Sequence, residues 1–447
     1  MEIKKNGVAI LDFGSQYTQL IARQVREHSV FSEVYSAETP LETILLNNPS
    51  AIILSGGPSS VFTKNKPEFD DSIFQMNIPI FGICYGLQVL AHYYGGKVKT
   101  SDNGEYGSAE MIIESPSIIF DGIPESSKVW MSHMDSVSEL PKKWKKLALS
   151  SNGLVAAIGN EDLSRIGTQF HPEVIHTDFG SKILRNFLFN IAKCSSGWTS
   201  KNFIDTQIKK IKKQVGDKKV IVGVSGGVDS SVVATILHKA IGNNCISILI
   251  DHGLMRKNES EECLISLKDG AGLKINIFNE SEIFYKKLKK VTDPEKKRKI
   301  IGNQFIYSFS KISKNFGEIE FLAQGTLYPD VIESGVNNGK SAHVIKSHHN
   351  VGGLPDDLDF ELIEPLRDLF KDEVREVGRK LGLSEDLISR HPFPGPGLAV
   401  RIIGQISKER VKILQQADKI YIDILKKEGL YNEIWQAFGV LLPIKTV

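Results

Sequence analysis

The sequence predicts an α/β protein with two doubly wound domains, each built on a parallel sheet. Short apolar runs rich in Val and Ile, which are typical of buried parallel strands, alternate with amphipathic stretches. Each run ends at Gly, Asp, Ser or Cys before a helical pattern starts, as in the strand–turn–helix units of open α/β sheets. The chain has 447 residues, enough for several domains of roughly 100–200 residues each.

The predicted strands form an early and a late group: residues 7–11, 51–54 and 78–83, then 220–224 and 246–250. Ligands of doubly wound sheets bind at the carboxyl ends of the strands, so functional residues are expected just after these runs. A polar, turn-rich segment at 194–200 separates the groups, and a Pro- and Gly-rich stretch at 390–397 cannot continue a helix. The expected domains are 1–194, 198–390 and 391–447.

Composition argues against several classes of protein. The chain is 41% hydrophobic and 24% charged, as in ordinary globular proteins, and its net charge of +2 is too weak to indicate nucleic acid or an anionic membrane as the main partner. No apolar run approaches the ~20 residues of a membrane span, and no signal-peptide core is evident. The 4 cysteines form no Cys-x-x-Cys pair, and we expect a reducing, cytoplasmic compartment.

The first chemical centre surrounds Cys84. Residues 82–86 read Gly-Ile-Cys-Tyr-Gly between an apolar strand and a helical stretch, which is the nucleophile-elbow pattern with cysteine in place of serine. The following helix N-terminus favours the thiolate. His171 and Glu173 are expected to supply a proton shuttle and its orienting carboxylate, because residues two apart in an extended segment point to the same side. A lone cysteine after a strand is usually a core residue, but the combination favours catalysis.

Acyl transfer also needs hydrogen-bond donors for an oxyanion. The backbone N–H of Tyr85, directly after the nucleophile, is one expected donor. Residues 55–58 read Ser-Gly-Gly-Pro, and glycine lets backbone approach a ligand closely. The N–H of Gly57 is therefore the second expected donor.

The second chemical centre is a predicted phosphate-binding loop between a strand and a helix. Two glycines and three serines at a helix N-terminus offer N–H groups, hydroxyls and a favourable dipole to an anion. The loop lacks the lysine of a Walker A motif. Asp229 is expected to help position Mg²⁺, which prefers oxygen ligands. The residues expected to bind ATP are Ser225, Gly226, Gly227, Val228, Asp229, Ser230 and Ser231.

These motifs resemble those of known families. Residues 1–192 resemble a class I glutamine amidotransferase domain at residues 82–86 and 171–173, and the Ser-Gly-Gly-Val-Asp-Ser loop resembles that of the N-type ATP pyrophosphatases. Together with the opening at 12–18, the whole chain resembles the glutamine-hydrolysing GMP synthetase family. The resemblance implies that Cys84 forms a thioester with glutamine, while His171 transfers protons.

The resemblance also implies one overall reaction. ATP adenylylates the C2 oxygen of xanthosine 5′-monophosphate (XMP), and ammonia from glutamine displaces AMP to give GMP, so the chain is expected to be a ligase of purine biosynthesis that uses ATP and Mg²⁺. The same resemblance places residues 132–135 near the bound glutamine and residues 251–256 near the nucleoside half of ATP. Arg298, Asp330 and Lys346 become expected substrate or lid contacts, although for Arg298 the residues alone favour a solvated charge in a basic run.

Two further expectations follow from the resemblance. The family has a C-terminal α+β dimerisation domain that continues past Val447, so residues 391–447 would form only part of it and the full-length protein is expected to be a homodimer. An alternative is a glutamine-dependent, AMP-forming synthetase acting on another carbonyl, such as that of a NAD precursor, but those enzymes resemble a nitrilase-like glutaminase instead. A non-enzymatic scaffold would predict a broken triad or loop, and both are intact.

Overall fold

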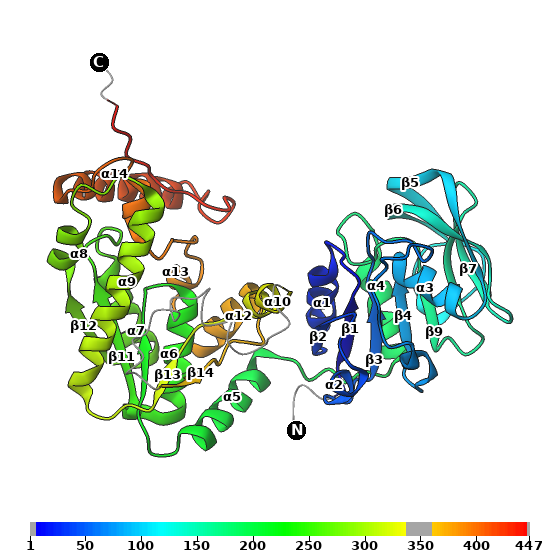
Figure 1. Ribbon diagram of the computed structural model, residues 1–447, viewed down its shortest axis with the longest axis horizontal. Helices are drawn as coiled ribbons and strands as arrows, with labels where there is room; N and C mark the ends of the chain where they lie inside the picture. The colour runs from blue at the N-terminus through cyan, green and yellow to red at the C-terminus, as the bar shows by residue number, and fades with distance from the viewer. Residues whose placement is uncertain (1–5, 337–359, 445–447) are drawn as a thin grey trace. The chain divides into compact units, whose positions relative to one another are not determined.

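The computed structural model of the protein describes residues 6–336 and 360–444. The chain divides into two compact units, Met1–Asn202 and Phe203–Val447, and each unit contains one sheet (Figure 1). The three domains expected from the sequence, including a partial dimerisation domain at 391–447, stay predictions.

The sheet of the first unit has nine strands in the order β2-β1-β3-β4-β9-β8-β7-β5-β6. The strands are β1 (Val8–Asp12), β2 (Ser32–Ser36), β3 (Ala51–Leu54), β4 (Ile80–Ile83), β5 (Lys97–Ile113), β6 (Ser126–Glu139), β7 (Lys145–Ser150), β8 (Val155–Gly159) and β9 (Arg165–Thr168). The five strands from β2 to β9 in this order pair in parallel, and the other four extend the sheet in antiparallel fashion. The predicted parallel α/β core is confirmed, whereas the antiparallel extension was not predicted.

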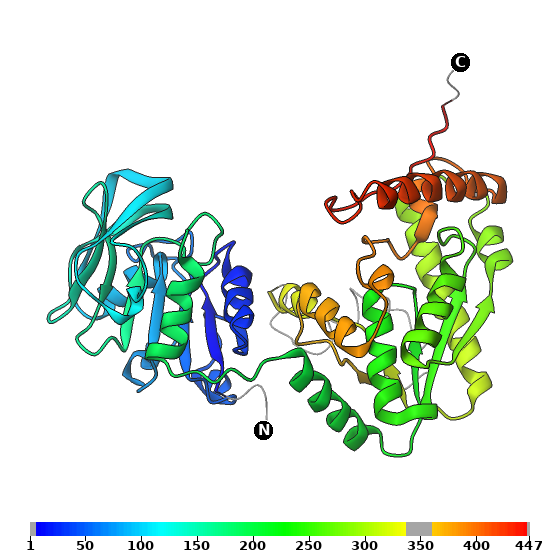
Figure 2. The same ribbon diagram turned by 180° about the vertical axis from the view of Figure 1, so that it is seen from behind.

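Helices cover both faces of this sheet (Figures 1 and 2). They are α1 (Thr18–Glu27), α2 (Leu41–Leu45), η1 (Asp71–Gln75), α3 (Tyr85–Tyr93), η2 (Ile118–Phe120), α4 (Gly180–Arg185) and η3 (Asn186–Ile191). One core cluster joins Ile44 of α2 and Leu90 of α3 to Ile52 of β3. On the other face α1 contacts α4, and Phe187 stacks on Phe81 of β4 with ring centroids 5.1 Å apart. This two-sided cover is the doubly wound arrangement that the sequence predicts.

The second unit has a five-stranded, fully parallel sheet in the order β12-β11-β10-β13-β14. Its strands are β10 (Val220–Gly223), β11 (Cys245–Asp251), β12 (Ile275–Asn279), β13 (Phe321–Ala323) and β14 (Glu361–Ile363). The chain proceeds outward from β10 to β12 and then returns to the opposite side of β10. The strand order therefore reverses between β10 and β13, which is where doubly wound sheets bind ligands.

The second unit also has helices on both faces of its sheet. The helices from the linker onward are α5 (Ser200–Val215), α6 (Val228–Ile241), η4 (Gly242–Asn244), α7 (Glu259–Ala271), α8 (Ser281–Lys287), α9 (Pro294–Ser313), η5 (Lys314–Phe316), α10 (Tyr328–Val336), α12 (Lys371–Leu381), α13 (Glu385–Ile388), η6 (Gly397–Arg401) and α14 (Lys408–Lys427). Helix α6 contacts α7 and α12 in one layer. Phe284 of α8, Phe309 of α9 and Leu414 of α14 share a core with Ile221 and Leu322 of the sheet.

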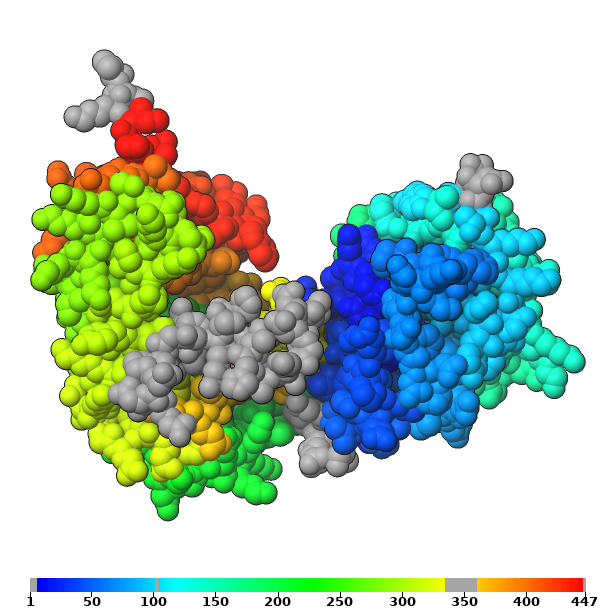
Figure 3. Space-filling model, viewed as in Figure 1, coloured from blue at the N-terminus to red at the C-terminus, as the bar shows by residue number. Residues whose placement is uncertain are grey.

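All four cysteines are buried and free. Among the helices that the structure describes, none combines the length and the apolar composition that a membrane crossing requires. The last described residues extend away from the body of the second unit (Figure 3), and Leu442 and Ile444 are exposed.

Candidate active sites

Cys84 occupies the turn between β4 and α3 in a backbone conformation that few non-glycine residues adopt. Its φ and ψ are 51° and −104°. Two flanking glycines make this turn possible. A Cβ atom on Gly82 would lie 2.5 Å from the Gly86 carbonyl, and one on Gly86 would lie 2.4 Å from the Leu54 carbonyl oxygen. The sequence Gly-Ile-Cys-Tyr-Gly thus forms a strained elbow, and such strain is common where a nucleophile is presented.

His171 and Glu173 lie beside this elbow in a buried arrangement. His171 Nδ1 and Glu173 Oε1 are 2.8 Å apart, and both side chains are almost fully buried. The same imidazole also interacts electrostatically with the Cys84 side chain. Burial alone lowers the pKa of His171, but hydrogen bonds and charges from Cys84 and Glu173 outweigh it and raise the pKa to about 10. The ring is therefore cationic at neutral pH and faces the sulfur atom.

The segment that contains the two predicted oxyanion donors runs next to the nucleophile. A Cβ atom on Gly56 would lie 3.7 Å from the Cys84 Cβ and 3.2 Å from His171 Cε1. Gly57 packs so closely on Phe13 that a Cβ there would lie 2.6 Å from the Phe13 carbonyl oxygen. Tyr85 is the first residue of α3, and such a residue has no partner for its N–H inside its own helix. The roles of Gly57 and Tyr85 remain predictions.

Sequence reasoning missed one glutamine beside the sulfur atom and a second glutamine that contacts the first. Gln169 Nε2 lies 3.6 Å from Cys84 Sγ, and Gln88 Nε2 lies 3.5 Å from Gln169 Oε1. The carbonyl oxygen of Ser132, in the segment that the resemblance assigned to the glutamine site, is also 3.6 Å from Cys84 Sγ. Gln169 directly precedes Phe170 and His171, but an amide carries no local signal that would have distinguished it from a core residue.

The predicted phosphate-binding loop connects β10 to α6 and is braced by its own hydroxyls. Ser230 Oγ accepts the Ser225 N–H at 3.2 Å and lies 3.1 Å from Ser225 Oγ. Ser231 Oγ donates to the Gly227 carbonyl at 2.8 Å. Gly226 has a φ of +80°, which favours glycine. Strand, turn and helix N-terminus thus lie as the motif predicts.

Lys371 is a site residue that the sequence did not reveal. It is the first residue of α12, and its Nζ lies 2.6 Å from each carboxylate oxygen of Asp229. Both side chains are partly exposed. The ion pair places a cation at the phosphate-binding loop, which complements the helix N-terminus as an anion site.

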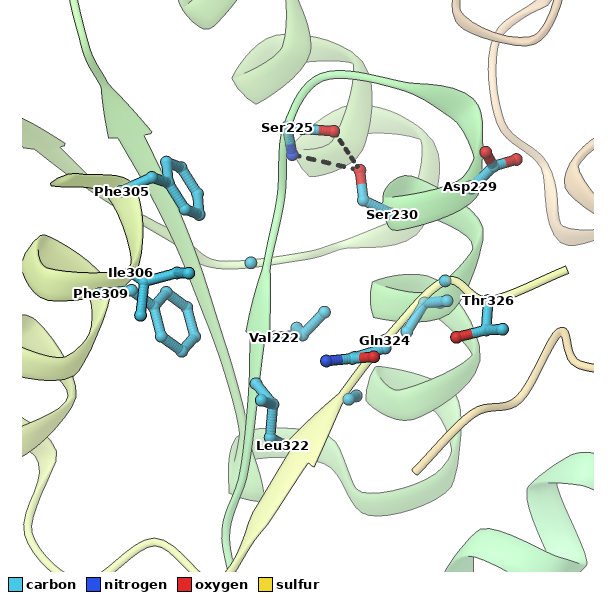
Figure 4. Close-up of a pocket in the computed structure, with 14 residues that line it drawn as sticks. Val222, Ser225, Asp229, Ser230, Phe305, Ile306, Phe309, Leu322, Gln324 and Thr326 are labelled. Atoms are coloured by element: carbon cyan, nitrogen blue, oxygen red, sulfur yellow. Dashed lines mark hydrogen bonds between the residues drawn. The ribbon is translucent and has the colours of Figure 1, made fainter. Parts of the chain in front are cut away.

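A cavity of about 340 Å³ opens at the point between β10 and β13 where the strand order reverses. Figure 4 shows Phe305 and Phe309 of α9 facing Val222 and Leu322 across it, with Ser230 at its rim. One wall is therefore aromatic and aliphatic, while the other end is the phosphate-binding loop. Such a cavity fits a nucleoside whose phosphates extend over the loop.

A second, larger cavity of about 740 Å³ shares Ser225, Asp229 and Phe305 with the first. Its lining contains two carboxylates, Asp229 and Glu259, and a larger number of cationic side chains: Arg256, Arg298, Lys371, Arg375 and Arg390. His252 and Met255, from the segment expected to hold the nucleoside half of ATP, line this larger cavity instead of the smaller one. Two cavities that meet at one phosphate-binding loop can hold two anionic substrates side by side.

The three residues predicted to contact a substrate or form a lid lie in different surroundings. Arg298 lines the larger cavity and is largely exposed, with Nη1 at 3.5 Å from Glu295 Oε2. Asp330 lies in the first turn of α10, where its Oδ2 accepts the Leu327 N–H at 2.9 Å. Lys346 lies outside the described residues. The roles of all three in substrate binding stay predictions.

Comparison with known proteins finds a different family in each of two parts of the chain. The family described as Glutamine amidotransferase class-I matches residues 9–191, and the family described as NAD synthase matches residues 199–303. The fold and these two matches define a class I glutamine amidotransferase joined to a synthetase of the ATP pyrophosphatase type.

Relatives across nearly the whole chain identify the family. The glutamine-hydrolyzing GMP synthase of Thermosipho melanesiensis is 53% identical over 444 residues, which are 98% of this chain and 86% of the relative. The enzyme of Brachyspira hyodysenteriae is 51% identical over 98% of this chain and 85% of the relative. That of Aquifex aeolicus is also 51% identical, over 100% of this chain and 87% of the relative. The chain belongs to the glutamine-hydrolysing GMP synthase family. The alternative of a different carbonyl acceptor gains no support from these relatives.

Proposed function

We propose that the protein forms GMP from XMP, ATP and glutamine, with Cys84, His171 and Glu173 as its glutaminase centre and residues 225–231 as its ATP site. The observation that carries this proposal is the presence of an intact triad and an intact Ser-Gly-Gly-Val-Asp-Ser loop on one chain with GMP synthase relatives along nearly its whole length. A glutaminase alone would not need the loop, and an ATP-using synthetase alone would not need the triad.

In the glutaminase reaction the Cys84 thiolate attacks the side-chain amide carbon of glutamine. Gly57 and Tyr85 N–H groups stabilise the oxyanion, and the His171 imidazolium gives its proton to the departing ammonia. Thioester formation removes the negative charge of the sulfur atom and its hydrogen bond, both of which raise the pKa of His171. The pKa of the ring therefore falls after acylation, and the neutral ring accepts a proton from the water that releases glutamate.

In the synthetase reaction the adenosine half of ATP occupies the smaller cavity, and XMP occupies the larger, cationic one. The C2 oxygen of XMP attacks the α-phosphorus, pyrophosphate leaves along residues 225–231, and ammonia then displaces AMP from C2. The Asp229 carboxylate and the serine hydroxyls are hard oxygen donors that suit Mg²⁺, which when bound would neutralise the phosphate charge. Asp229 is paired with Lys371, so binding of Mg²⁺ would require the carboxylate to leave this ion pair, and the Lys371 ammonium would then be free to face the phosphates.

A homodimer and a cytoplasmic location belong to the same proposal. Helix α14 exposes Ile413, Ile420 and Ile424, which are 48%, 62% and 53% accessible and lie on one helix face at spacings of seven and four. Four buried free cysteines fit a reducing compartment. Light scattering of the full-length protein tests the dimer.

The direct test of the reaction is an assay that contains XMP, ATP, Mg²⁺ and glutamine. GMP, AMP, pyrophosphate and glutamate should appear in equal amounts. AMP release that depends on another carbonyl acceptor, and not on XMP, would contradict the proposal.

A further inference from the structure

Arg390 reaches the phosphate-binding loop from a distant part of the sequence. Its Nη1 donates to the Gly226 carbonyl oxygen at 3.1 Å, across 164 residues of sequence. The same guanidinium lies 3.7 Å from Glu259 Oε1 and 3.3 Å from Glu262 Oε2, and the arginine side chain is only 19% exposed. Two hydrogen-bond acceptors and a further carboxylate therefore fix the orientation of one planar cation.

The contact with Gly226 bears directly on the anion-binding groups of the loop. In a trans peptide the carbonyl and the following N–H point in opposite directions. Holding the Gly226 carbonyl therefore also fixes the direction of the Gly227 N–H, at the N-terminus of α6. Gly226, with its φ of +80°, has access to more backbone conformations than other residues, so an external partner restricts it more. A loop ordered before the phosphates arrive has less entropy to lose on binding.

The residue after Arg390 is anchored in a third part of the chain. The His391 ring stacks on Tyr431 with centroids 3.9 Å apart. Its Nδ1 accepts the Ala437 N–H at 3.0 Å, which leaves the proton on Nε2 to be donated to the Tyr431 carbonyl at 2.8 Å. The His391 N–H donates to the Tyr431 hydroxyl oxygen at 3.1 Å. Ring and backbone of His391 are thus both fixed on residues 431–437.

We infer that Arg390 is a positioning residue for the phosphate-binding loop, and that residues 431–437 hold Arg390 in place through His391. Two carboxylates flank the guanidinium, so it acts as a brace for the Gly226 peptide and not as an uncompensated cation for phosphate. Residues 431–437 thereby influence ATP chemistry without contacting ATP. This inference rests on the proposed function of residues 225–231.

The test compares variants in XMP-dependent AMP release with ammonium as the nitrogen source, which bypasses the glutaminase. Arg390→Lys keeps the charge but has a single nitrogen that cannot hold Gly226 and Glu262 together. It should lower kcat roughly tenfold to a hundredfold and weaken pyrophosphate binding measured by calorimetry. Tyr431→Phe removes only the hydroxyl that accepts the His391 N–H and should lower kcat less, in the same direction.

Arg379→Lys is the matched control, because Arg379 binds Glu376 and Glu385 and has no described contact with the loop. It should retain wild-type kcat, and its melting temperature shows what the same exchange does to folding. Wild-type kcat in both Arg390→Lys and Tyr431→Phe would overturn the inference. A raised KM for ATP at unchanged kcat in Arg390→Lys would also overturn it, because Arg390 would then be a phosphate ligand. Absence of AMP release from the wild type would instead refute the proposed function.

Discussion

Replacing Glu173 with glutamine tests how the triad is held in its reactive state. The exchange keeps the shape of the side chain but removes the charge that faces His171 Nδ1 at 2.8 Å. A glutamine amide can also rotate and donate to this nitrogen, which would select the wrong tautomer of the ring. The variant should therefore impair proton transfer to departing ammonia while leaving the elbow at Cys84 intact.

The size of the effect follows from the electrostatics of His171. The difference between the ordinary pKa of 6.5 and about 10 corresponds to a net stabilisation of the cationic ring by about 5 kcal/mol, at ~1.4 kcal/mol per pKa unit. Cys84 and Glu173 supply the favourable part of this stabilisation. Loss of the charge-assisted hydrogen bond from Glu173 should cost roughly 1.5–3 kcal/mol in the transition state, which is a decrease of about 10- to 150-fold in kcat for glutamine hydrolysis.

The assay is glutamate release from glutamine as a function of pH, with the ammonium-dependent reaction measured in parallel. Since the pKa of His171 would fall, the decline of activity at high pH should begin at lower pH in Glu173→Gln than in the wild type. Glu139→Gln is the matched control, because Glu139 is exposed on β6 in an ion pair with Lys97. Wild-type glutamine hydrolysis in Glu173→Gln, or an equal loss in Glu139→Gln, would refute this reasoning.

Three further predictions concern the elbow, the loop and pH. Gly86→Ala should abolish glutamine hydrolysis and lower the free energy of unfolding in urea by about 2–4 kcal/mol, because the new Cβ would lie 2.4 Å from the Leu54 carbonyl oxygen. A variant as stable as the wild type would contradict the steric argument. Asp229→Asn should lower ammonium-dependent GMP formation about tenfold to a hundredfold and leave Lys371 without its anionic partner, and an unchanged dependence on Mg²⁺ would argue against a metal role for Asp229. The pKa of His171 is higher in the folded protein than in the unfolded chain, so its contribution to stability is fully present below pH 6.5 and is lost as pH rises through about 10. The free energy of unfolding should therefore fall between pH 6.5 and about 10. The decrease should be smaller in His171→Asn.

The sequence predicted those features that depend on local pattern. Cys84 and His171 belong to short motifs in which neighbouring residues determine the geometry, and the structure brings them together as expected. Lys371 and Arg390 reach the loop from 142 and 164 residues away, and no local pattern distinguishes them from other surface cations. The antiparallel strand β6 was not predicted because it alternates buried and exposed residues and so lacks the continuous apolar run that is typical of buried parallel strands. The expectation for Asp330 came from family resemblance, and the structure adds a local role for its carboxylate at the start of α10.

As proposed, one chain contains an ammonia-producing centre at Cys84 and a separate ammonia-using centre at residues 225–231. The most direct measurement is GMP formation by Cys84→Ala with glutamine and, separately, with ammonium as the nitrogen source. Glutamine-dependent formation of GMP should vanish, while ammonium-dependent formation should stay within about twofold of the wild type. Loss of both activities in a folded variant, or retention of the glutamine-dependent activity, would contradict the assignment of the two centres.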